Sequence, residues 1–167
     1  MGSVESKQTK GQILNCNRYT HYYGVRKKDS QEWQSAWPQL VEDVPKIIEA
    51  SGIQISGPSQ ERDVVTPPLA DTQEGIHLNG VGEDSYESFV IDKSGSKRFC
   101  KTARRPYDLV VTTVLLRAKT LAPNDFNLSS DGFWEEEWGD TRRIYGQLWP
   151  DEYPQRPWNE EDEEAGE

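Results

Sequence analysis

The chain has 167 residues and a formal net charge of −10, and its length suits one domain of ordinary size. It is polar, with a mean hydropathy of −0.87, but an aromatic content of 10% is enough to build a hydrophobic core. The longest apolar stretches are far shorter than the ~20 residues that cross a bilayer, and the N-terminus lacks the apolar core of a signal peptide. These features exclude a membrane-spanning protein and disfavour classical secretion.

The charge is divided between the two ends of the chain. Residues 1–28 carry a net charge of +5, whereas residues 150–167 carry −7. The acidic total disfavours nucleic acid as a partner, because the phosphates would be repelled. Without a secretory signal, Cys16 and Cys100 are expected to be reduced, so we expect an intracellular, cytoplasmic protein.

The first half of the chain predicts a tail, an arm and one helix. Residues 1–12 are polar and lack a period, which indicates a flexible tail, and residues 13–28 suit a strand or an ordered arm. Apolar residues then recur at helical spacing up to residue 50. Pro38 predicts a helix that begins there after a short turn, and Pro45 predicts a kink.

Short alternating runs follow, and they predict a small sheet. Residues 52–57 and 75–80 are bounded by glycines and are expected to be strands, separated by a loop over 58–74. Residues 75–92 are expected to form a hairpin, and residues 93–96 a turn.

Two helices and a strand are predicted in the second half. A central helix begins at Pro106 and ends before Pro123, and a short strand covers 126–128. Ser130 or Asp131 would cap a last helix that stops at Pro150. The expected fold is α+β, with a small, mainly antiparallel sheet packed by two or three helices. Residues 13–150 would form the single domain, and residues 151–167 an acidic tail that contains Pro and Trp, disordered like the basic N-terminus.

A nucleophilic enzyme would have to use a serine activated by a base, or Cys100. Its basic neighbours would lower the pKa of the thiol, and His77 or His21 would be the imidazole base. The alternative is a structural cysteine on a strand edge beside Phe99, with His77 exposed on a sheet face.

A carboxylate pair is the other catalytic candidate. Glu83 and Asp131 could form such a pair and act on an anionic substrate. Catalytic carboxylate pairs carry no local sequence signature, so the sequence does not exclude one. No metal-ligand spacing and no nucleotide-binding loop is present, so neither a metal nor a cofactor is expected. The carboxylates would otherwise solvate a turn or cap a helix.

The densest cluster of cations lies in residues 93–105, just before the central helix. An anionic ligand, such as a phosphate or an acidic peptide, is a candidate for this loop. The alternatives are a solvated loop or a docking site for the acidic tail of the same chain. The expected binding residues are Lys97, Arg98, Lys101, Arg104 and Arg105.

Tryptophans supply the other candidate binding residues. Trp134 belongs to an aromatic helix surface, and Trp158 stands alone in the acidic tail, where it resembles a short anchor for a basic, grooved partner. At the N-terminus, Gly2 followed by Ser6 fits the N-myristoylation pattern, and a membrane would be a partner only if Gly2 carries the lipid.

The leading functional hypothesis is a non-enzymatic interaction or regulatory protein. Its partners would be proteins bound through residues 93–105, the aromatic helix surface and the acidic tail. A small enzyme that uses Cys100 or the carboxylate pair is the first alternative. A structural protein that self-assembles through its aromatic faces is the second.

Overall fold

The computed structural model describes residues 18–61 and 63–165, and the predictions for residues 1–12 and Gly2 lie outside this part of the chain. The α+β class is confirmed. In chain order the elements are β1 (Thr20–Val25), α2 (Gln31–Ser51), β2 (Leu69–Asp71), β3 (Gly75–Leu78), the 3-10 helix η2 (Gly82–Asp84), β4 (Phe89–Ile91), β5 (Arg98–Lys101), α3 (Asp108–Leu121), β6 (Phe126–Ser130), α4 (Gly139–Leu148) and α5 (Glu160–Ala165).

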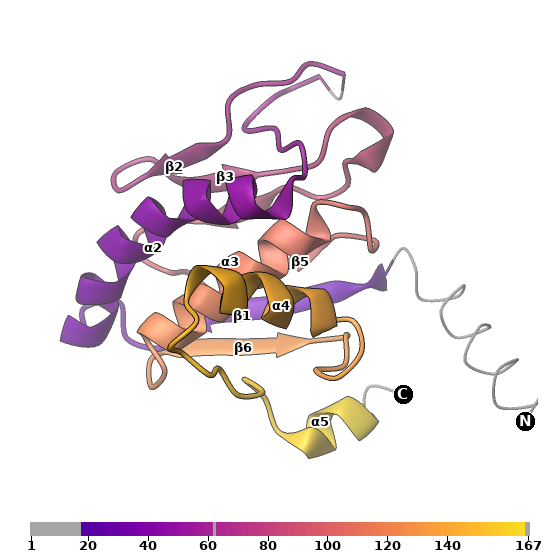
Figure 1. The fold of residues 1–167 in the computed structure, drawn as a ribbon. Helices are drawn as coiled ribbons and strands as arrows, with labels where there is room; N and C mark the ends of the chain where they lie inside the picture. Colours follow the sequence, from indigo (N-terminus) through magenta and orange to yellow (C-terminus); the bar gives the residue numbers. More distant parts are fainter. Residues whose placement is uncertain (1–17, 62, 166–167) are drawn as a thin grey trace, which may run out of the picture.

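The strands form two antiparallel sheets, where one was expected. The first has the strand order β5-β1-β6, and the second has the order β2-β3-β4. α2 packs against α3 and β2, and α3 also packs against β6. In Figure 1 the helices α2 and α3 therefore lie between β2 and β3 above and β1 and β6 below. The hydrophobic core consists of the apolar side chains between these layers.

Helix α2 is longer than predicted, because it runs unbroken through Pro38 and Pro45. It begins where the Ser30 hydroxyl accepts a hydrogen bond from the Trp33 amide at 3.0 Å, and it ends at Gly52, whose φ of 68° is left-handed. Both prolines are exposed. The opposite face, with Trp33 among its buried residues, stabilises the helix enough to offset the ~3 kcal/mol that each internal proline costs.

Helix α3 is the buried centre of the domain, as predicted. Arg117, only 6% exposed, points from α3 to Asp43 of α2, and its Nε lies 2.7 Å from the carboxylate. Its Nη1 donates to Tyr145 of α4 at 3.0 Å and to Glu152 at 3.1 Å, and its guanidinium lies 3.9 Å from the centre of the Trp149 ring. One buried cation thus connects α2, α3, α4 and the segment after α4.

Local predictions failed where long-range contacts replaced local ones. The expected strand over 52–57 is only a bridge between Ser56 and Asn79, and β2 lies inside the predicted loop. The helix predicted to start at Ser130 or Asp131 begins instead at Gly139, because residues 134–138 form turns. Trp138 holds these turns by donating from its indole to the Ser130 hydroxyl at 3.1 Å.

The acidic C-terminal segment packs on the domain. Trp158 is 7% exposed, and its ring lies 5.1 Å from that of Trp138 and 6.3 Å from that of Trp134. Glu163 of α5 accepts a hydrogen bond from the Trp134 amide at 2.9 Å. In Figure 1 α5 lies below β6, on the side of this sheet away from the helices. Within residues 18–61 and 63–165, no helix combines the length and the apolar character that crossing a bilayer requires.

Candidate binding surface

Two aromatic side chains lie side by side on the outer face of the β5-β1-β6 sheet. Tyr22 of β1 is directly opposite Phe99 of β5, and the two residues are 44% and 58% exposed. Because side chains alternate along a strand, the neighbours His21 and Tyr23 point inward and are buried. Exposed aromatic pairs of this kind are typical of binding surfaces.

Cations flank this aromatic pair. Lys101, also on β5, places its ammonium 5.9 Å from the centre of the Phe99 ring, and Lys97 is exposed just before the strand. We call Tyr22, Phe99, Lys97 and Lys101 the sheet-face patch. It joins two of the five predicted cations to two aromatic residues that were not predicted as binding residues.

The other cations of the predicted cluster lie elsewhere. Arg98 pairs with Asp92 at 3.2 Å. Arg104 pairs with Glu137 at 2.8 Å, and its guanidinium lies 4.1 Å from the centre of the Tyr19 ring. Arg105 lines a separate hollow beside the 56–64 loop. The five cations named as candidate binding residues therefore do not share one surface, because β5 and the turn after it place them beside different neighbours.

A hollow of about 560 Å³ adjoins the sheet-face patch, between the outer face of the sheet and the C-terminal segment. Its lining includes three cationic side chains, those of Arg26, Lys97 and Lys119. Gly24 lines it from the middle of β1, where a side chain could not fit, because its Cβ would lie 2.7 Å from the Cα of Lys97. Trp158 lines the hollow from the C-terminal segment.

Lys119 is held in place at this hollow. Its ammonium donates to the carbonyl oxygens of Pro123 and Phe126, both at 2.9 Å, so two of its three N–H groups are used. Burial lowers the pKa of Lys119, while the nearby Glu32 carboxylate acts in the opposite direction. The cation is thus positioned before any ligand binds.

The surroundings of Cys100 differ from those that its basic neighbours in sequence predicted. The side chain is fully buried in β5, and the thiol faces the carbonyl oxygens of Glu87 and Ser88 at 3.6 and 3.8 Å. Burial raises the pKa of Cys100 far above its usual range, and the charges of Glu87 and Asp108 raise it further. The structural alternative fits this position better than a catalytic thiolate does.

The buried His21 takes part in a network of catalytic residue types. Its Nε2 lies 2.6 Å from Asp108 Oδ1, and its Nδ1 lies 2.8 Å from Ser130 Oγ. Ser130 Oγ also accepts hydrogen bonds from the amide of Gly132 at 2.9 Å and from the indole of Trp138 at 3.1 Å. The network connects β1, β6 and α3 around an imidazole that is fully buried.

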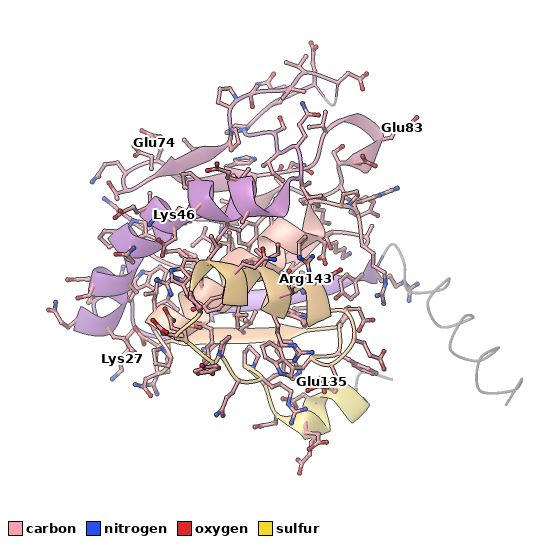
Figure 2. All side chains as sticks on the ribbon, in the orientation of Figure 1. Lys27, Lys46, Glu74, Glu83, Glu135 and Arg143 are labelled. Carbon is pink, nitrogen blue, oxygen red and sulfur yellow. The ribbon has the colours of Figure 1, made fainter. Side chains whose placement is uncertain are left out.

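The remaining catalytic candidates do not come together. His77 is half-buried in β3, and burial lowers its pKa. Glu83 is in η2, whereas Asp131 follows β6, accepts a hydrogen bond from the Thr20 amide at 3.1 Å and has its pKa raised by burial. Figure 2 shows Glu83 beside the upper sheet and Glu135, of the segment after Asp131, on the opposite side of the molecule.

Neither tryptophan of the predicted binding set is free for a partner. Trp134 and Trp158 are both buried against the chain itself, so the expected anchor in the tail is wrong in its placement. Among the residues described, no group of three His, Cys, Asp or Glu side chains is arranged to hold a metal ion.

Comparison of the chain with protein-family models, with curated proteins and with solved structures gave no match.

Proposed function

We propose that this chain is a non-catalytic interaction protein that binds an acidic segment of a partner protein through the sheet-face patch. The observation that carries the proposal is the exposure of Tyr22 and Phe99 on adjacent strands, beside Lys97 and Lys101. Aromatic side chains provide large contact areas at a low entropic cost, and tyrosine is enriched among residues that dominate binding energy.

The positive charge of the sheet-face patch favours an acidic partner. The chain as a whole carries a net charge of −10, and this charge repels acidic molecules. The cationic patch is a local exception that attracts them. Lysines at the rim of an aromatic patch steer an acidic segment toward it and restrict its orientation. The catalytic alternative has less support, because Cys100 and His21 are both fully buried, and the carboxylates of Glu83 and Asp131 lie on different elements.

The proposal is tested by site-specific photo-crosslinking in cells of the native host. A photoreactive residue at Phe99, and a second one at Tyr22, should crosslink to the same partner. Tyr153, which is 85% exposed and outside the patch, is the control position. The proposal is abandoned if positions 99 and 153 give the same crosslinks, or if neither gives any.

Charge reversal tests the electrostatic part of the proposal. Lys101→Glu should reduce crosslinking at position 99 by about tenfold, since charge-assisted contacts contribute roughly 1.5 kcal/mol or more. Lys93→Glu is the matched control, because Lys93 belongs to the same basic segment but donates to Gln73 in the turn between β2 and β3. Equal loss in both variants would indicate a general charge effect instead of a specific surface.

A further inference from the structure

We propose that the hollow between the sheet and the C-terminal segment binds a small organic anion with a planar ring, of the size and chemistry of a mononucleotide. This inference is independent of the proposed function, although the two surfaces share Tyr22 and Lys97. It follows from the volume, the charge and the polar lining of the hollow.

The volume fits a ligand of this size. At about 560 Å³, the hollow lies in the middle of the range of small-molecule sites, roughly 300–1,000 Å³. Gly24 keeps it open from the β1 side, because its backbone lies against that of Lys97 and leaves no room for a larger residue. On the opposite side Trp158 is held by its contacts with Trp134 and Trp138, so this wall is ordered before a ligand binds.

The charge of the lining opposes that of the whole chain. Within the described part of the chain, the lining contains the cations Arg26, Lys97 and Lys119 and one carboxylate, Asp162. A site with this excess of positive charge on a protein of net charge −10 favours an anion. Lys119 is oriented by two carbonyl oxygens and retains one N–H group to donate. A phosphate group satisfies several such donors at once.

The rest of the lining suits a planar ring with polar edges. Tyr22 and Trp158 both line the hollow, and aromatic side chains stack on planar rings. Asn127 and Ser129 of β6 supply an amide and a hydroxyl, which can hydrogen bond to the edge of the ring. An anion without a ring would leave the aromatic part of the lining unused.

The experiment uses the full chain and four probes, the 5′-monophosphates of adenosine, guanosine, cytidine and uridine. Isothermal titration calorimetry should detect saturable binding of at least one of them. NMR spectra recorded during the titration should show the largest shifts at the amides of Gly24, Asn127 and Ser129. Inorganic phosphate lacks the ring, and the matching nucleoside lacks the phosphate. Each should bind at least tenfold more weakly than the nucleotide.

Surface variants test whether the nucleotide binds in the hollow. Lys97→Gln and Tyr22→Ala remove exposed groups, and each should weaken the nucleotide by about tenfold. Lys93→Gln and Tyr153→Ala make the same chemical changes at exposed sites outside the hollow and should leave the affinity unchanged. Circular dichroism of all four variants checks that the fold is retained.

Four results would overturn the inference. They are the absence of saturable binding of any monophosphate at millimolar concentration, binding of inorganic phosphate as tight as that of the nucleotide, equal effects of the Lys97 and Lys93 variants, and binding only of an oligonucleotide. The last result would identify a nucleic-acid surface in place of a small-molecule site.

Discussion

Trp158 packs edge-to-face against Trp138, with ring centroids 5.1 Å apart, although 19 residues of mixed structure separate the two in sequence. The contact makes the acidic C-terminal segment part of the folded domain. It also leaves the tryptophan too little exposed to anchor a partner protein, and it builds one wall of the hollow.

We predict that Trp158→Ala releases this segment. Replacing a buried aromatic residue by alanine costs about 3 kcal/mol or more, so the free energy of unfolding should fall by roughly that amount. Limited proteolysis with an enzyme that cleaves after acidic residues should then cut within residues 160–163 far faster than in the unmodified chain. Tyr153→Ala, which changes an exposed aromatic nearby, should leave the cleavage rate as it is. Equal protection in both variants would contradict the packing role of Trp158.

The buried ion pair gives a second prediction. Asp43→Asn leaves the Arg117 guanidinium buried with Glu152 as its remaining anionic partner. Removing one member of a buried pair costs about 3–5 kcal/mol, and we expect a loss near the lower end because Glu152 remains. Urea unfolding followed by circular dichroism measures the change. Glu42→Gln, on the exposed side of the same helix, should change stability by less than about 0.5 kcal/mol.

The thiol of Cys100 should be unreactive in the native protein. In a Cys16→Ser background, iodoacetamide at mildly alkaline pH should label Cys100 only as fast as the chain unfolds, because burial both excludes the reagent and raises the pKa of the thiol. Addition of urea to the unfolding midpoint should accelerate labelling sharply. Rapid labelling without denaturant would restore the thiolate enzyme as a hypothesis.

His77 should lower the free energy of unfolding at mildly acidic pH. Burial lowers the pKa of His77 in the folded chain below the 6.5 of the unfolded chain. The unfolded state therefore binds more protons in this window. The stabilising contribution is fully present above pH 6.5 and is lost as the pH falls toward the folded pKa.

Two measurements check this dependence. NMR titration of the His77 ring should give a pKa below 6.5. The loss of stability between about pH 7.5 and about pH 5.5 should be smaller in His77→Gln than in the unmodified chain. A folded pKa above 6.5, or an unchanged pH dependence in the variant, would contradict the role of burial.

Local sequence patterns determined the helices that bury one face. The spacing of Trp33, Leu40 and Val44 predicted α2, and the apolar stripe after Pro106 predicted α3, because a helical period describes which residues share a face without reference to the rest of the chain. The strand after Pro123 was also predicted, since Phe126 and Leu128 flank a polar residue and are bounded by turn residues. The α+β class followed from these elements.

Tertiary structure decided the rest, and above all the site. Whether Tyr22 or Tyr23 faces the solvent depends on which side of β1 the helices cover, and the partner of Tyr22 is set by its register with β5, residues that lie more than seventy positions away. The charges of Lys97, Arg104 and Arg105 were visible in the sequence, but the turns that separate them were not. Pairing between residues that are far apart in the sequence stabilises these arrangements. A local sequence pattern does not indicate which residues will pair.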